Sequence, residues 1–273
     1  MPSPSRLASV ARNRRIPRRT RRDLLLAEAR RRLRPKSAYA VRYGPGRVFL
    51  SHDDYAIDWE SLKFVIADEA YAGDYAGAIV LDLGAHKGYY GAYALAKGAR
   101  TVVSFEPESV NVELLERAAT TYRRDGVDWE VRPSAVAAEE GEAELHVMGA
   151  SWGHSLHPPD EFSKYEIGVR RVPVEAMANV LEDARALASR ARLVVKVNVE
   201  GEECGVVLGT PAAAWEVVSE LFVEMHGWAP CTAADLAEHL APAGLSEVPS
   251  AMERVLRLRR AEASPAGPHS APS

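Results

Sequence analysis

The fold of this chain is decided by the ten residues Val80-Leu-Asp-Leu-Gly-Ala-His-Lys-Gly-Tyr89. They overlap an apolar run, Ala78-Ile-Val-Leu-Asp82, which has the length of a buried strand. A glycine turn follows, and the residues from Gly88 to Lys97 are expected to form a helix. A strand, a glycine loop and a helix in this order form the corner at which α/β sheets bind their ligands.

Strands and helices continue to alternate on the C-terminal side of this loop. Short runs rich in valine and leucine are separated by segments whose apolar residues have helical spacing. This alternation predicts an α/β fold with a central, mostly parallel sheet and helices on both faces. Further strands are expected at 101–105, 129–132, 193–199 and 220–225, a hairpin at 138–147, an edge strand at 255–258, and helices at 110–122, 174–188 and 233–240.

A ligand site is expected at the carboxyl edge of this sheet. Ligands of parallel α/β sheets bind outside the carboxyl ends of the strands. Polar residues stand at or beside each of these predicted strand ends, namely Asp82, Glu106, Ser134, Asn198 and Glu224.

The sheet is expected to fill one domain, residues 76–262, of a chain of 273 residues. Residues 23–75 are expected to form an extension with a helix and a hairpin around Gly44-Pro45-Gly46. The stretch from Trp59 to Tyr71 has helical spacing and is expected to pack against the domain. Two disordered tails are predicted, a basic one at 1–22 and one rich in Pro, Ser and Ala at 263–273.

Charge is distributed unevenly along the chain. The net charge is −4, but residues 1–36 alone carry +11, so the remainder carries −15. A basic start is typical of a segment that touches nucleic acid, an anionic surface or an acidic partner, and equally of a solvated tail. The acidic remainder would repel a phosphate backbone, which makes a nucleic-acid partner an unfavourable expectation.

The composition favours a soluble globular protein. Hydrophobic residues make up 47% and charged residues 26%, and no apolar run reaches the roughly 18 to 20 residues of a membrane span. The two cysteines, Cys204 and Cys231, lie far apart without metal-ligand spacing, so neither a disulfide nor a zinc site is expected. The apolar run of a secretory signal is absent from the N-terminus, and a reducing, cytoplasmic location is the prediction.

The glycine loop itself indicates the cofactor. Its pattern is D-x-G-x-x-x-G rather than the dinucleotide pattern G-x-G-x-x-G. Asp82 would repel a pyrophosphate, whereas it would attract the ammonium group of S-adenosylmethionine, directly or through water. Glu106 ends the next strand, where a carboxylate can accept hydrogen bonds from both ribose hydroxyls. The two acids together predict S-adenosylmethionine as the cofactor.

Several motifs resemble the FkbM family of methyltransferases. They are 80–89, Phe105-Glu-Pro107, Ser134-Ala-Val136, Lys196-Val-Asn-Val-Glu-Gly-Glu-Glu203 and Glu224-Met-His226, which together span residues 78–228. The resemblance implies a Rossmann-like class I methyltransferase fold and methylation of a hydroxyl on a small molecule such as a secondary metabolite, sugar or lipid. The family motif around residue 198 usually has aspartate, and this chain has Asn198.

The resemblance also implies residue roles. Backbone and side chains at the first loop would line the methionine end, Glu106 would hold the ribose, and Ser134 and Ala135 would border the adenine. The loop residues in question are Asp82, Gly84, Ala85, His86 and Gly88.

Acceptor chemistry is expected from residues at the exits of the later strands. A hydroxyl acceptor must lose its proton to a base within hydrogen-bond reach. His86, Glu200 and His226 are candidate bases, with His154 on a loop over the site, although His86 could instead contact the cofactor. Asn198 can orient a hydroxyl but cannot take a proton at neutral pH. His226 could instead stabilise a turn, and Glu200 could cap the following helix. The stretch Ser151-Trp-Gly-His-Ser155 is either a lid over the acceptor or a plain surface loop.

The same residues also allow other functions to be considered. A magnesium or manganese site at the strand exits is weakened by Asn198, so no metal is predicted. A nucleic-acid methyltransferase would use the basic N-terminus as an arm. A dehydrogenase is disfavoured by Asp82 and by the missing middle glycine, and a non-catalytic, cofactor-binding homologue remains an alternative because of Asn198.

Overall fold

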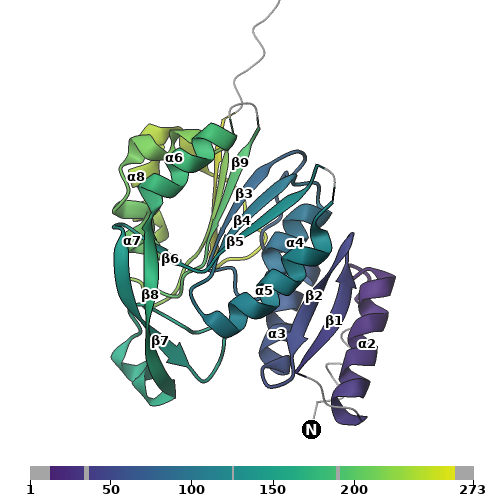
Figure 1. Cartoon of the computed structure of the whole chain (residues 1–273). Helices are drawn as coiled ribbons and strands as arrows, with labels where there is room; N and C mark the ends of the chain where they lie inside the picture. The colour runs from purple at the N-terminus through teal and green to yellow at the C-terminus, as the bar shows by residue number, and fades with distance from the viewer. Residues whose placement is uncertain (1–12, 34–36, 125, 189–190, 262–273) are drawn as a thin grey trace, which may run out of the picture.

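The computed structural model describes residues 13–33, 37–124, 126–188 and 191–261. Its central feature is a seven-stranded sheet (Figure 1). Short runs of β-branched and leucine residues form the strands, and every residue of the three central ones is buried. The strands are β3 (Ile79–Leu83), β4 (Thr101–Phe105), β5 (Asp128–Arg132), β9 (Leu193–Val197), β10 (Glu220–Glu224), β11 (Leu245–Glu247) and β12 (Val255–Arg260).

The strand order is β11-β12-β10-β9-β3-β4-β5. The strands from β10 to β5 run parallel, whereas β12 is antiparallel to both of its neighbours. The expected Rossmann-like α/β fold is therefore confirmed. One detail was wrong: the segment 255–258 is not an edge strand, because residues 245–247 pair along its outer side.

Helices cover both faces of the sheet (Figure 1). One hydrophobic core joins α4 and α5 to one face, and a second core joins α6, α7 and α8 to the other. Three short 3₁₀ turns, η2 (Asp160–Tyr165), η3 (Ala212–Val217) and η4 (Ala241–Ala243), complete this part. The helices are α4 (Tyr89–Ala96), α5 (Ser109–Tyr122), α6 (Met177–Leu187), α7 (Glu203–Leu208) and α8 (Ala233–Leu240).

The N-terminal extension shares the core of the α4–α5 face. It comprises α2 (Arg18–Leu33), the predicted hairpin of β1 (Ala38–Tyr43) and β2 (Gly46–Ser51), α3 (Tyr55–Leu62) and the π-helical turn η1 (Lys63–Ala67). Figure 1 shows the hairpin outside α5 and α2 outside the hairpin. Buried side chains from all of these elements join those of α4 and α5 in one cluster.

The N-terminal basic tail is shorter than predicted. Helix α2 begins at Arg18, so residues 18–22 are helical rather than disordered. Ile16, Thr20 and Leu24 are each buried, which anchors this stretch despite its many arginines. Residues 1–12 and the predicted C-terminal tail from residue 263 lie outside the described residues.

A small three-stranded sheet replaces two predicted features. It consists of β6 (Ala135–Ala137), β7 (Gly141–Met148) and β8 (Glu166–Ala176) in the order β6-β8-β7. The hairpin expected at 138–147 is wrong, because β6 and β7 each pair with β8 and not with each other. The helix expected from residue 174 begins at Met177, because the alternating burial of Val172, Val174 and Ala176 continues strand β8.

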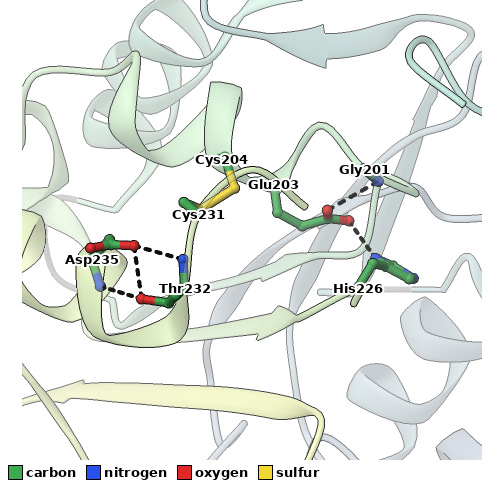
Figure 2. The surroundings of a disulfide bond; sticks show 7 residues. All are labelled: Gly201, Glu203, Cys204, His226, Cys231, Thr232 and Asp235. Carbon is green, nitrogen blue, oxygen red and sulfur yellow. Dashed lines mark hydrogen bonds and ion pairs between the residues drawn. A yellow bond between two sulfur atoms is a disulfide. The ribbon is translucent and has the colours of Figure 1, made fainter. Parts of the chain in front are cut away.

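The expectation of unpaired cysteines is also wrong. Cys204 of α7 forms a disulfide with Cys231, whose Cα lies 5.9 Å away (Figure 2). The two residues are 27 positions apart in the sequence, but β9 and β10 are parallel neighbours, so the segments that follow them leave the same edge of the sheet. The sequence argument for a reducing compartment thereby loses its basis. Among the described residues, no helix is both long and apolar enough to span a membrane.

We predict that Gly84→Ala lowers the free energy of unfolding far more than Gly126→Ala does. Both glycines have positive φ, 72° and 74°, so both variants acquire backbone strain of about 1 to 2 kcal/mol. A methyl group at Gly84 would also overlap the backbone carbonyl oxygen of Asn198, whereas one at Gly126 would meet nothing within 4 Å. Urea unfolding should show a loss of about 4 kcal/mol or more for Gly84→Ala. Equal losses in the two variants would contradict this account.

Candidate functional site

A cavity of about 870 Å³ lies at the carboxyl edge of the parallel strands. Its size falls within the range of about 300 to 1,000 Å³ that is usual for small-molecule sites. One side is formed by the loops after β3 and β4, and the other by the exits of β9 and β10 together with η1. This is the edge at which the sequence predicted a site.

The glycine loop contributes one wall of the cavity. Gly84, Ala85 and His86 all line it, and His86 adopts a positive φ of 51°. Gly88 does not line the cavity. A Cβ atom at Gly88 would lie 2.7 Å from Leu115 of α5, so helix packing by itself requires a glycine at this position.

Glu106 points back toward the same loop. Its carboxylate accepts hydrogen bonds from the backbone N–H groups of His86 at 2.7 Å and of Glu108 at 3.0 Å. Burial raises the pKa of Glu106 to about 7, although these N–H donors act in the opposite direction. Glu106 therefore changes its protonation state near neutral pH while it lines the cavity.

Asp82 occupies a different position from the one expected. It is fully buried and does not line the cavity, and its Oδ1 accepts a hydrogen bond of 3.0 Å from Lys196 Nζ. Lys196 also donates to the carbonyl oxygens of Leu83 and Gly84, and this lysine does line the cavity. The second carboxylate oxygen of Asp82 is buried without a hydrogen-bond partner. Lys196 thus lies between Asp82 and the cavity. The sequence analysis assigned no role to this lysine.

The two residues expected at the adenine end separate in the structure. Ala135 lines the cavity. Ser134 is buried, and its hydroxyl donates to Glu175 Oε1 at 2.6 Å, so it secures the loop after β5 to β8. Both residues thus stand near the cavity, but only Ala135 faces it.

His226 and Glu200 are neighbours, as the strand exits predicted. His226 Nε2 lies 3.4 Å from Glu200 Oε2, and His226 Nδ1 donates to Glu203 Oε1 at 3.1 Å. Glu203 is fully buried and also accepts from the backbone N–H group of Val199. It accepts from the backbone N–H group of Gly201 as well (Figure 2). Sequence reasoning missed Glu203, although it is the last acid of the motif at residues 196–203.

This arrangement changes the expected role of His226. Burial alone would lower its pKa, but hydrogen bonds and charge from Glu200 and Glu203 raise the pKa to about 10. His226 is therefore an imidazolium at neutral pH and has no free lone pair with which to act as a base. Glu200 lines the cavity in a left-handed backbone conformation with φ 52°, and burial raises the pKa of its carboxyl while His226 lowers it. Of His226 and Glu200, Glu200 is the one with a vacant acceptor position.

A second polar cluster is centred on Glu224. Its Oε2 accepts from Tyr71 OH at 2.6 Å and from Asn198 Nδ2 at 3.0 Å, and its Oε1 lies 3.0 Å from Arg254 Nε. All four residues line the cavity. The Oδ1 atom of Asn198 is buried and lacks a hydrogen-bond partner. Tyr71 and Arg254 were not predicted, because neither lies at a strand exit of the motif region.

The segment 151–155 is part of the cavity wall. Ser151, Trp152 and His154 line the cavity, which fits the expected position over the site. Ser151 Oγ lies 2.9 Å from His86 Nε2, and Ser155 Oγ donates to the backbone oxygen of Glu200 at 2.6 Å. The segment is thereby fixed to both sides of the cavity.

Lys87 fixes the glycine loop from behind. Its side chain is fully buried, and Nζ lies 2.6 Å from Asp58 Oδ1 of α3 and 3.0 Å from Ser151 Oγ. Burial raises the pKa of Asp58 to about 6 despite the opposing effect of Lys87. This pair connects the N-terminal extension to the loop that lines the cavity.

Metal-ligand geometry is not found in the part of the chain that the structure describes. Within residues 13–261, gaps excepted, no group of three or more His, Cys, Asp or Glu side chains is arranged to hold a metal ion. The two polar clusters are occupied by hydrogen bonds and ion pairs within the protein.

Comparison with known proteins gave similarity to solved structures only. No protein-family model and no curated protein sequence matches the chain. One similar structure is a methyltransferase FkbM from Methylobacillus flagellatus KT, with 13% identity and a TM-score of 0.46 over 76% of this chain and 53% of that one. The chain thus spans about half the length of that protein.

Two further structures have comparable similarity. The magnesium protoporphyrin IX methyltransferase from Synechocystis PCC 6803, solved with bound S-adenosylmethionine, has 11% identity and a TM-score of 0.40 over 94% of this chain and 90% of that one. A structure described as a putative RNA methyltransferase, from Pyrococcus horikoshii, has 12% identity and a TM-score of 0.39 over 74% of this chain and 85% of that one.

We predict that Lys87→Met costs about 3 to 5 kcal/mol of unfolding free energy, because the buried Asp58 carboxyl loses its cation and must either stay charged without it or take up a proton. The control Lys97→Met removes a lysine whose side chain is 43% exposed in its pair with Glu69, and it should cost less than about 1 kcal/mol. Adding Asp58→Asn to Lys87→Met should recover part of the loss. Urea denaturation measures all three variants, and a similar small effect of both lysine substitutions would contradict the role assigned to Lys87.

Proposed function

We propose that this protein is an S-adenosylmethionine-dependent methyltransferase that methylates a hydroxyl group of a small molecule. One observation carries the proposal. A single cavity joins a half with the features of a cofactor site, the glycine loop and Glu106, to a half in which a carboxylate, Glu200, is paired with an imidazolium.

The cofactor half fits the proposed cofactor at its sugar and at its adenine end. Glu106 is fixed by two N–H groups, and its carboxylate oxygens retain lone pairs that can accept from two ribose hydroxyls. Ala135 offers a small apolar surface for adenine. The backbone from Gly84 to His86 would border the methionine end.

Lys196 modifies the electrostatic argument for the methionine end. The cofactor's ammonium was expected to be attracted by Asp82, but Lys196 neutralises much of that charge. The unpartnered Oδ2 of Asp82 and the unpartnered Oδ1 of Asn198 remain as buried acceptors on this side of the sheet. We therefore assign most of the cofactor's binding energy to Glu106 and the loop, and less to Asp82 than the sequence implied.

The acceptor half supplies a base. When bound, S-adenosylmethionine supplies an electrophilic methyl group on a sulfonium. Glu200 takes the proton of the acceptor hydroxyl as the oxygen gains its bond to carbon. The positive charge of His226 lowers the pKa of Glu200 and so opposes the effect of burial, and the amide of Asn198 can orient the hydroxyl without removing its proton. In-line alignment of the two reactants contributes up to about 7 to 11 kcal/mol in reactions of this kind.

A small acceptor is favoured over nucleic acid by the charges around the cavity. Six carboxylates on its walls outnumber the four cations there, and this excess of negative charge would repel a phosphate backbone. The carboxylates are Glu60, Asp68, Glu106, Glu200, Glu202 and Glu224, and the cations are Lys63, Lys196, His226 and Arg254. The arginine-rich helix α2 lies outside the β1–β2 hairpin, on the far side of that hairpin from the sheet (Figure 1). We therefore propose a small molecule, rather than nucleic acid, as the methyl acceptor.

We predict that S-adenosylhomocysteine binds about tenfold more tightly at pH 8 than at pH 6. If the ribose requires ionised Glu106, a pKa near 7 raises the competent fraction from about one tenth to about nine tenths over this interval. Glu106→Gln should weaken binding and remove the pH dependence. Calorimetry at both pH values tests this, with Glu113→Gln, whose side chain is 73% exposed on α5, as the unchanged control.

The same titrations test the assignment as a whole. Absence of binding of both S-adenosylmethionine and S-adenosylhomocysteine to the wild type would end the proposal. Tighter binding of NAD than of either ligand would favour a dehydrogenase instead.

We predict that Glu200→Gln lowers kcat by about 10²-fold or more while leaving S-adenosylhomocysteine affinity unchanged, because it removes the base but not the cofactor contacts.

His226→Gln removes the positive charge beside Glu200, so the pKa of Glu200 rises and the acid limb of the pH–rate profile moves to higher pH. Transfer of labelled methyl to a panel of hydroxylated small molecules identifies an acceptor for these assays. Glu182→Gln, 75% exposed, is the control, and a wild-type rate for Glu200→Gln would exclude it as the base.

A further inference from the structure

The segment 225–231, between β10 and α8, separates two hollows in the protein. His226 and Trp228 line the central cavity on one side. On the other side, Met225, His226 and Cys231 line an open groove. The position of this segment therefore decides where the His226 side chain lies relative to Glu200.

Only the two ends of this segment, Met225 and Cys231, pack against the hydrophobic core. Every residue from 225 to 231 is at least partly exposed. Its backbone contributes the hydrogen bonds from Met225 N–H to the Arg254 oxygen and from Ala229 N–H to the His226 oxygen. The Trp228 ring lies against His226, with centroids 4.7 Å apart, and against Phe162. Segments with so few buried contacts open more easily than the core of a domain.

The disulfide supplies a covalent anchor at the end of this segment. Cys231 is bonded to Cys204, which directly follows Glu203 in the sequence (Figure 2). On the other side of Cys231, Thr232 and Asp235 form a reciprocal capping box that fixes the start of α8. The bond thus ties the segment that carries His226 to the helix that carries Glu203.

We propose that the Cys204–Cys231 disulfide is a positioning element of the catalytic centre, which holds His226 between Glu203 and Glu200, so that reduction of the bond by a dithiol releases His226 and lowers the rate of methyl transfer. The effect on rate rests on the proposed function. The effect on the position of His226 depends only on the contacts of Glu203, His226 and the disulfide.

Accessibility favours attack at one of the two sulfurs. Cys231 is partly exposed and lines the open groove, whereas Cys204 is 6% exposed. A thiolate of the dithiol attacks Cys231 Sγ, the S–S bond breaks, and Cys204 leaves as a thiolate that takes a proton. The second thiol of the reductant then displaces Cys231. Both cysteines end as thiols, and the two-electron donor ends as a cyclic disulfide.

The position of His226 can be followed without any assay of activity. In the oxidised full-length protein, NMR titration of the His226 ring, assigned with His226→Gln, should give a pKa near 10. After treatment with a dithiol, and in Cys204→Ser/Cys231→Ser, the pKa should fall toward the ordinary histidine value of 6.5. Thiol labelling before reduction should find neither cysteine free. Free thiols in air-oxidised protein, or the same His226 titration in both redox states, would overturn the proposal.

The catalytic part of the proposal is tested in the same samples. Reduction should lower kcat at least tenfold with S-adenosylhomocysteine affinity within twofold, and reoxidation should restore the rate. Dithiol added to Cys204→Ser/Cys231→Ser should change nothing, which confines the effect to this bond. Circular dichroism tests whether the double variant is folded. If the variant is unfolded, reduced wild-type protein is used in its place. Failure of the oxidised protein to bind S-adenosylhomocysteine refutes the proposed function, while the His226 titration still decides whether the disulfide positions that residue. An unchanged rate in reduced, folded protein overturns the catalytic role.

Discussion

The backbone contact between the loop after β3 and the exit of β9 is the constraint on which the rest of this site depends. At Gly84 the loop lies so close to the carbonyl oxygen of Asn198 that no side chain fits between them. Lys196 reinforces the contact by donating to the Gly84 carbonyl and to Asp82. Because these two strand exits touch, the glycine loop and the acids that follow β9 face a common cavity rather than two separate hollows.

Charged side chains around this cavity are organised in pairs. Lys196 neutralises Asp82, Arg254 pairs with Glu224, and His226 lies between Glu200 and Glu203. Buried charges are costly unless they are paired, so each pairing offsets part of the cost of burying its members. Glu106 is the exception among the acids at the strand exits, because N–H and amide donors rather than a cation surround it. Burial therefore raises the pKa of Glu106 to about 7, and among the described residues no paired cation opposes that effect.

The N-terminal extension belongs to the site as well as to the core. Lys87 reaches from the glycine loop to Asp58 of α3, and Tyr71, which follows η1, reaches Glu224 at the exit of β10. The extension therefore supports both halves of the cavity from outside the sheet. The disulfide plays a comparable part on the other side, where it joins two segments that leave neighbouring strands.

Local sequence patterns were enough to predict the α/β class, the strands around the glycine loop and the set of strand exits where polar residues gather. They were enough because buried parallel strands leave a strong local signal in short apolar runs, and because their carboxyl ends must share one edge. They also placed Glu106, Glu200 and His226 at that edge. How these groups are paired depends on tertiary contacts, which the sequence alone did not reveal. Asp82 meets Lys196, His226 meets two acids, and Cys204 meets Cys231 because residues distant in sequence are brought together by the order of the strands. The protonation of His226 and the oxidised state of the two cysteines depend on those pairings. A local pattern of residues cannot predict them.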